Sequence, residues 1–180
     1  MSLKQYFNKP LTVALATVAT ATLAPVASAA TFNFSYTSSA GTITATVDGT
    51  LQPDNNTVFV SSISNTTFNG SPAPALPFIG SAFDLFSTGF PTGQAVLSLD
   101  GSGLDFGTCN NTGCADGFAF VPATAFGVEV FASGTAYGQS FEPFILANYS
   151  LTTVPEPATV LGLLSVAGVG LLCKRRKLEK

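Results

Sequence analysis

Short runs of alternating apolar and polar residues fill the middle of this 180-residue chain. Residues 31–36 carry an aromatic ring at every second position, and residues 42–51 repeat the pattern with aliphatic side chains. A period of two puts alternate side chains on one face of a strand, whereas a helix needs apolar residues every three or four positions. Turn-forming residues separate the runs, as at residues 38–41 and 53–56. The pattern therefore predicts strands joined by turns.

The same pattern predicts roughly seven to nine strands between residues 30 and 153, with later runs at residues 57–63, 95–100, 117–121, 125–132 and 144–153. Asp48-Gly49 indicates a bulge or a bend, and residues 64–65 indicate a break. Residues 82–86 fit a short strand or a helical turn, and no other helix is expected before residue 158. We expect an all-β fold, an antiparallel β-sandwich or flattened barrel, with the Phe rings in its core.

The N-terminal segment has the three parts of a secretory signal peptide. Lys4 and Lys9 precede an apolar stretch at residues 11–23, which is too short to span a membrane. Ala27-Ser28-Ala29 then matches the small-x-small cleavage pattern. We predict a signal peptide, with a signal helix, over residues 1–29 and an exported chain that begins at Ala30. An uncleaved membrane anchor is the alternative.

Positive charge is confined to the two ends of the chain. Residues 30–153 contain no Lys, Arg or His. Their eight acidic residues give a side-chain charge of −8: Asp48, Asp54, Asp84, Asp100, Asp105, Asp116, Glu129 and Glu142. Such a segment repels nucleic acid, which binds proteins through Lys and Arg. Its hydroxyl, amide and backbone groups suit a carbohydrate-rich matrix instead.

The C-terminal end has three parts in a fixed order. Val154-Pro155-Glu156-Pro157 is held extended by its prolines, residues 158–173 are apolar and uncharged, and Lys174-Arg175-Arg176-Lys177 form a basic stop. A helix over the apolar run would be about 24 Å long, against about 30 Å of hydrocarbon, and the basic side chains can reach the interface. We predict a transmembrane helix at residues 158–173 with its basic tail in the cytoplasm. A buried helix of a soluble domain is the alternative.

This three-part end resembles the PEP-CTERM sorting signal of bacterial exported proteins. The resemblance implies that residues 154–180 are recognised by exosortase, a membrane-embedded cysteine transpeptidase that cuts at the signal. It also implies residence in the inner membrane before processing, and then a place at the cell surface or in extracellular polysaccharide. The expected partners are therefore exosortase, the membrane and exopolysaccharide, and not nucleic acid.

No catalytic constellation is visible in residues 30–153. Without His, Lys or Arg, the segment lacks the usual general base for a nucleophile and the usual cationic groups that stabilise an oxyanion. We therefore expect a non-enzymatic structural or adhesive matrix protein without cofactor or metal. The alternative is a carbohydrate-binding module or weak glycan hydrolase with a carboxylate pair, Asp100 with Asp105 or Asp84 with Glu129. Residues 100–105 also loosely resemble a calcium loop, although an Asp-Gly turn is the simpler interpretation.

Two cysteines lie close together within the predicted exported domain. Cys109 and Cys114 flank Asn110-Asn111-Thr112-Gly113, a sequence with turn-forming residues. In an exported chain this spacing predicts a small disulfide-closed loop. A metal-binding pair is the less favoured alternative, because the domain has no His and no further Cys.

Overall fold

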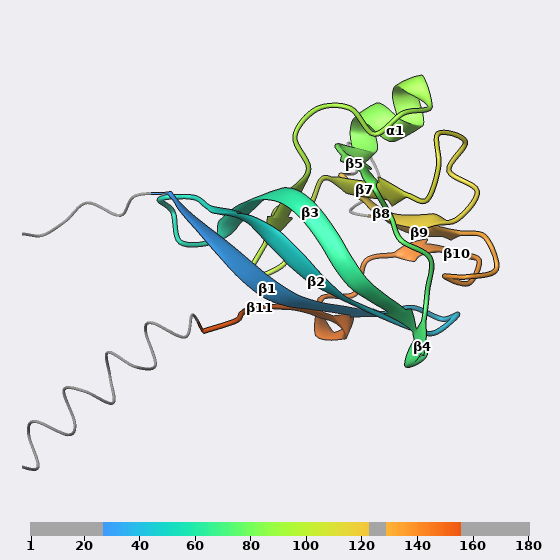
Figure 1. The fold of residues 1–180 in the computed structure, drawn as a ribbon, viewed down its shortest axis with the longest axis horizontal. Helices are drawn as coiled ribbons and strands as arrows, with labels where there is room; N and C mark the ends of the chain where they lie inside the picture. Colours follow the sequence, from blue (N-terminus) through green and yellow to red (C-terminus); the bar gives the residue numbers. More distant parts are fainter. Residues whose placement is uncertain (1–26, 123–128, 156–180) are drawn as a thin grey trace, which may run out of the picture.

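The computed structural model describes residues 27–122 and 129–155. Its elements are β1 (Ser28–Thr37), β2 (Thr42–Leu51), β3 (Thr57–Phe68), β4 (Ser71–Pro72), β5 (Phe78–Gly80), α1 (Ala82–Thr88), β6 (Val96–Ser98), β7 (Phe106–Cys109), β8 (Gly117–Val121), β9 (Glu129–Ser133), β10 (Ser140–Pro143), the 3-10 helix η1 (Leu146–Asn148) and β11 (Tyr149–Thr153). They form two antiparallel sheets (Figure 1). One has the order β11-β1-β2-β3-β4, with β6 also on β3, and the other has the order β10-β9-β8-β7-β5. The predicted all-β antiparallel architecture is confirmed.

The predicted signal helix and the predicted transmembrane helix at residues 158–173 lie outside the described residues. Within the described ranges, no helix has the length and apolar character needed to cross a membrane.

The first sheet follows the alternation of the sequence closely. β1 buries Phe32, Phe34 and Tyr36 on one face. The register between β2 and β3 shifts at Asp48 and Gly49, so of the predicted bulge or bend the bulge is correct. At residues 64–65, where the sequence predicts a break, β3 continues, but its register with β2 shifts between the pairs Thr46–Ser64 and Thr44–Thr67, and Asn65 adopts a left-handed conformation with φ of 50°. Asn tolerates this conformation better than most residues, so one irregular residue does not end the strand.

Aromatic rings from both sheets meet in the core. Phe34 stacks on Phe118 with ring centroids 5.5 Å apart, and Tyr36 meets Phe120 edge-to-face at 5.2 Å. All four rings are buried. Offset and edge contacts of this kind add stability beyond the burial of apolar area. The two sheets therefore pack face to face through aromatic side chains.

Helix α1 covers the outer face of the second sheet. Ala82 and Leu85 pack against Cys109 of β7 and Ala119 of β8. The Ser81 side chain accepts a hydrogen bond from the Asp84 amide at 3.1 Å and caps the N-terminus. Gly89 ends the helix in a left-handed conformation. Of the two alternatives for residues 82–86, the helical turn is correct.

The strand predicted at residues 144–153 is wrong in its first half. β10 ends at Pro143, η1 follows, and β11 begins at Tyr149. Tyr36 explains the change of direction, because its ring stacks on Phe144 at 5.8 Å and its hydroxyl accepts a hydrogen bond from the Ile145 amide at 3.3 Å. The chain bends around this tyrosine and only then joins the sheet.

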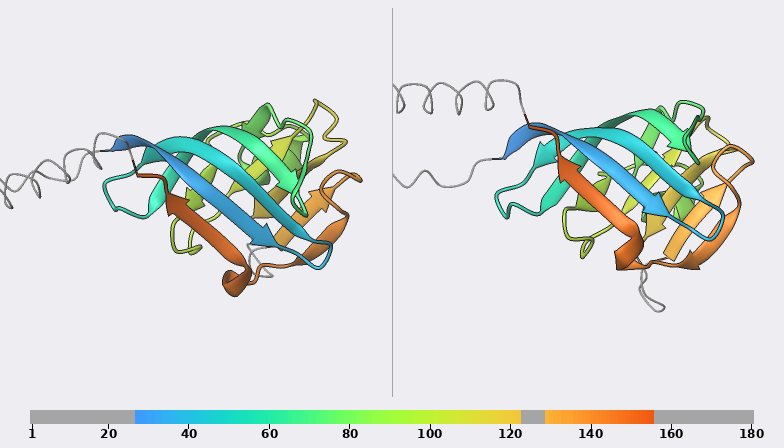
Figure 2. Two further views of the ribbon diagram at one scale, coloured as in Figure 1. Left: turned by 60° about the horizontal axis from the view of Figure 1, so that its bottom comes forward. Right: turned by 90° about the horizontal axis from the view of Figure 1, so that it is seen from below.

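The described chain begins and ends at the same end of the first sheet. β1 lies between β2 and β11, and the register places Phe32 opposite Thr153. In Figure 2 the start of β1, in blue, and the end of β11, in orange-red, lie side by side. The fold therefore brings together the two places at which the predicted targeting segments join the domain.

Candidate functional site

The first two residues of the predicted sorting motif directly follow the last strand. The Val154 amide donates a 2.8 Å hydrogen bond to the Thr31 carbonyl of β1, so the pairing of β11 with β1 continues into the motif. Val154 and Pro155 are exposed. Glu156, Pro157 and the basic stop at residues 174–177 lie outside the described residues. No free linker separates the folded sheet from Val154.

A shallow hollow lies next to this junction. Its volume is about 390 Å³, and it is lined by residues 29–31 and 48–50 with Ser61, Val154 and Pro155. Asp48 supplies the carboxylate, whose oxygens accept hydrogen bonds from the Thr31 hydroxyl at 2.8 Å and from the Ser62 hydroxyl at 2.9 Å. Gly49 allows the backbone of β2 to lie close to β3, since a Cβ at this position would lie only 2.7 Å from the Phe59 carbonyl oxygen. The bulged end of β2 thus holds a carboxylate beside the start of the motif.

Two of the predicted signal-cleavage residues, Ala29 and Ala30, line the same hollow. Ala27 is exposed, Ala29 lies opposite Thr50, and Ala30 lies opposite Gly49. The peptide bond between Ala29 and Ala30 therefore lies inside β1, which begins at Ser28. The alternation in the sequence indicates a strand only from residue 31, because small alanines give no periodic signal. Cleavage at this bond stays a prediction.

The comparisons with known proteins bear on this junction. Residues 153–177 match the family model of the PEP-CTERM protein-sorting motif. The chain carries a PEP-CTERM sorting signal. Such a signal implies export and processing at the membrane by exosortase. No curated protein and no solved structure matches the chain. The match begins at Thr153, so the PEP-CTERM signal overlaps the last residue of β11.

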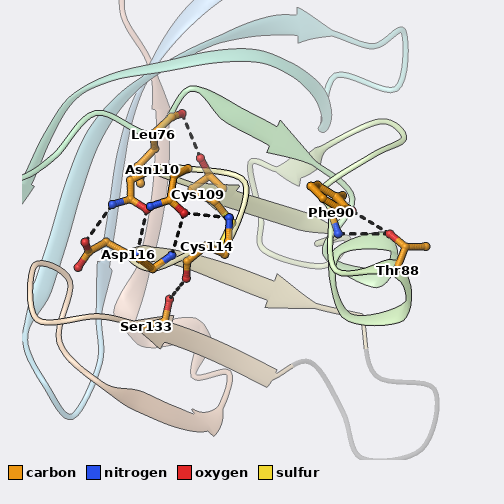
Figure 3. Close-up of a disulfide and its surroundings, with 12 residues drawn as sticks. Leu76, Thr88, Phe90, Cys109, Asn110, Cys114, Asp116 and Ser133 are labelled. Carbon is orange, nitrogen blue, oxygen red and sulfur yellow. Dashed lines mark hydrogen bonds between the residues drawn. A yellow bond between two sulfur atoms is a disulfide. The ribbon is translucent and has the colours of Figure 1, made fainter.

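Cys109 and Cys114 form a disulfide, with Cα atoms 4.8 Å apart (Figure 3). Cys109 is buried under α1, while Cys114 is half-buried and has φ of 49°. The side chain of Asn110 closes the loop a second time, because its Nδ2 donates to Asp116 Oδ2 and its Oδ1 accepts from the Asp116 backbone amide, each at 3.0 Å. The Asn110 amide also donates to the Asp116 carbonyl at 2.9 Å. These contacts fix the loop between β7 and β8.

The carboxylates proposed as pairs have separate partners. Asp105 accepts hydrogen bonds from the Ser81 hydroxyl at 2.7 Å and the Phe83 amide at 3.0 Å, and so supports the start of α1. Asp84 accepts from the Thr92 hydroxyl at 2.9 Å. In the part of the chain that the structure describes, no hydrogen bond links Asp100 with Asp105 or Asp84 with Glu129. The same part contains no group of three or more His, Cys, Asp or Glu placed to hold a metal ion.

Asp100 forms the predicted Asp-Gly turn. Its Oδ1 accepts hydrogen bonds from the Ser102 hydroxyl at 2.7 Å, the Ser102 amide at 2.9 Å and the Asn56 side chain at 2.9 Å. These bonds, those from Ser102 first, lower the pKa of Asp100 to about 2. The carboxylate is fully exposed, so it acts as the acceptor of a local turn.

Several Phe rings that the sequence assigns to the core lie on the surface. Phe86 of α1, Phe131 of β9 and Phe141 of β10 form an outer ring cluster, with centroids 5.3 Å apart between Phe86 and Phe131 and 6.4 Å apart between Phe131 and Phe141. Phe141 is 64% exposed and Phe86 is 49% exposed. Phe83 and Phe90 are also exposed. Alternation in the sequence places Phe141 on one face of its strand but does not show which face is covered.

Beside this cluster lies a second hollow of about 260 Å³, lined by Phe131, Ala132, Ser133, Gln139, Ser140 and Phe141. Its lining combines two rings with hydroxyl and amide groups and contains no charged side chain. This combination is typical of sites that bind uncharged polar ligands with an apolar face.

Proposed function

We propose that the exported domain is a non-enzymatic adhesive component of an extracellular polysaccharide matrix, and that it binds uncharged glycan through the outer ring cluster. The observation that carries the proposal is a row of three rings, in which the exposed Phe86 and the exposed Phe141 each contact the half-buried Phe131. Exposed apolar patches on soluble domains often mark interaction sites. A sugar ring has an apolar C–H face that fits an aromatic ring and a rim of hydroxyl groups that fits Ser and Gln.

Charge supports an uncharged glycan as the ligand. Residues 30–153 contain acidic side chains and no basic ones. Glu129 lies on β9 and Glu142 on β10, the two strands that carry Phe131 and Phe141. Acidic side chains repel uronate- or sulfate-bearing chains, and residues 30–153 supply no basic side chain to attract them. The PEP-CTERM signal supports the location, because it implies an exported protein processed at the membrane.

The test is retention of the purified full chain, held in detergent, on a panel of neutral and acidic polysaccharides. Phe141→Ser removes the most exposed ring and should weaken binding to the retained neutral glycan about tenfold, which is the effect of losing one aromatic contact. Phe59→Ser is the matched control, because Phe59 is 39% exposed on β3 of the other sheet. Failure of the wild-type chain to bind any polysaccharide, or equal losses in both variants, would contradict the proposal. Release of reducing sugar would contradict the non-enzymatic role.

A further inference from the structure

Strand β11 is an end strand of the first sheet, and among the described residues it pairs only with β1. Figure 2 shows β11, in orange-red, at the border of the sheet beside β1, in blue. An end strand presents a row of N–H and C=O groups on the side away from its neighbour, and a strand of another molecule can pair with that row.

The hydrogen bonds to β1 determine which backbone groups of β11 point outward. Thr153 lies opposite Phe32, and the next residue, Val154, donates to the Thr31 carbonyl at 2.8 Å. Because backbone groups alternate in direction along an antiparallel strand, those of Val154 face β1 and those of Leu151 and Thr153 face outward. We call the outward N–H and C=O groups of Leu151 and Thr153 the outer edge of β11. No backbone group in the described part of the chain bonds to this edge.

The outer edge of β11 lacks the protection that the other end strands have. Proteins shield end strands from unwanted pairing with prolines and charged side chains. Each of the other end strands has a proline within it or directly before it: Pro72 in β4, Pro77 before β5 and Pro143 in β10. Residues 149–153 of β11 include neither a proline nor a charged residue. This edge is thus open to pairing.

We propose that the sorting enzyme binds this chain by strand addition at the outer edge of β11, so that it recognises the last strand together with the motif. The PEP-CTERM match begins at Thr153, a residue of β11 whose backbone groups face outward. Pairing with β1 continues to Val154, so the edge and the start of the motif form one extended segment. The partner is an extended segment of the enzyme that offers alternating C=O and N–H groups. Glycan binding at the outer ring cluster plays no part in this interaction.

The position of Pro155 agrees with this arrangement. Since Val154 faces β1, the nitrogen of Pro155 belongs to the outward series, together with those of Leu151 and Thr153. A proline is tolerated in a sheet where the missing N–H would face away from the neighbouring strand. Pro155 therefore leaves the pairing of Val154 intact. The Thr153 amide is the last outward donor before this proline.

The first experiment removes that donor in the full-length chain, in a host that contains the sorting enzyme. Thr153→Pro deletes the outward N–H, and Thr153→Ala is the matched control because it changes the side chain and keeps the N–H. Pulse-chase labelling with mass measurement gives the rate of processing. We expect Thr153→Pro to slow processing about fivefold, the effect of one lost backbone hydrogen bond, and Thr153→Ala to leave it unchanged. A wild-type rate for Thr153→Pro, or an equal loss in Thr153→Ala, would overturn the proposal.

A spacer tests whether the edge and the motif are recognised together. Ten Gly and Ser residues inserted between Thr152 and Thr153 extend on average about 17 Å and keep the matched residues 153–177 contiguous. Processing should slow about tenfold or more, because the enzyme can no longer hold the edge and the motif as one segment. In this background Thr153→Pro should cause no further loss, since Thr153 no longer lies in the sheet. An enzyme that reads the motif alone would process the spacer variant at the wild-type rate, and that result would overturn the proposal.

A second copy of this chain is the other possible occupant of the outer edge. Residues 30–153 carry acidic side chains and no basic ones, so two copies repel each other. Sedimentation of the purified full chain in detergent should therefore give a monomer. A wild-type dimer that Thr153→Pro converts to a monomer would show that the edge pairs copies of the chain, and would overturn the proposal.

Discussion

Removal of the Cys109–Cys114 disulfide should weaken the domain without unfolding it. The bond closes a loop with a sequence separation of 5. The chain-entropy model gives about 2 kcal/mol for a loop this short. Replacing both cysteines by Ala also removes the Cys109 sulfur from a fully buried site beside Ala82, Leu85 and Ala119, which costs about 1 kcal/mol. The expected loss in the free energy of unfolding is therefore about 3 kcal/mol, against about 5–15 kcal/mol for a typical domain.

The loop should keep its shape because Asn110 and Asp116 close it independently. Three hydrogen bonds of 2.9 to 3.0 Å join these two residues. Asp116 Oδ1 also accepts from the Ala136 amide at 3.2 Å and ties the loop to the segment that follows β9. The Cys109→Ala/Cys114→Ala variant should thus retain one cooperative unfolding transition with an unchanged denaturant slope.

The assay is urea unfolding, followed by circular dichroism, of the oxidised exported protein, the reduced protein and the double variant. The midpoints of the reduced protein and of the variant should both lie below that of the oxidised protein, and the variant should be the less stable of the two by about 1 kcal/mol, because it also lacks the buried Cys109 sulfur. A loss of the cooperative transition would refute the argument that hydrogen bonds suffice to close the loop. Thiol labelling of both cysteines in unreduced exported protein would refute the bond itself.

Three further predictions concern the core, the Asp100 turn and the N-terminus. Phe118→Ala should lower the free energy of unfolding, measured in urea, by about 3–5 kcal/mol, because the Phe118 ring contacts those of Phe34 and Phe106. A loss no larger than that caused by Phe118→Leu would contradict this packing. Hydrogen bonds lower the folded-state pKa of Asp100 to about 2, below the unfolded value of about 3.9. The ionised Asp100 side chain therefore stabilises the folded domain above about pH 4, and this contribution is lost as the pH falls toward 2. Asp100→Asn should therefore reduce the fall in Tm between pH 4 and pH 2, and an unchanged profile would contradict the role of this turn. N-terminal sequencing of the exported protein should begin at Ala30, and a sequence that begins at Met1 or Ser2 would disprove cleavage.

The first sheet could be predicted well from the sequence because its strands are long and half-buried. Phe32, Phe34 and Tyr36 alternate with polar residues, and this local pattern determines which face of β1 is buried. The bulge at Asp48 and Gly49 was also predictable, since both residue types favour irregular backbone. The sorting signal was predictable for a different reason, because its three parts are contiguous in the chain and need no tertiary contact to be recognised.

The remaining features depend on contacts between distant residues. Tyr36 turns the chain at Phe144 and Ile145, 108 and 109 residues further on, so no local pattern marks the end of that strand. Phe118 and Phe141 both alternate with small or polar neighbours, yet one is buried in the core and the other is 64% exposed. Which face is covered depends on the packing of the two sheets. The hollow beside Val154 arises in the same way, because it requires the pairing of the first strand with the last.

The absence of Lys and Arg from residues 30–153 has a consequence for the lifetime of the exported domain. Trypsin-like proteases cut after a basic side chain, and this segment offers them no bond to cut, folded or unfolded. Most proteins resist such enzymes only while they stay folded, because local opening exposes susceptible bonds. Here the resistance lies in the composition and persists when a strand opens. An exported domain of this composition would outlast its neighbours wherever trypsin-like enzymes dominate degradation.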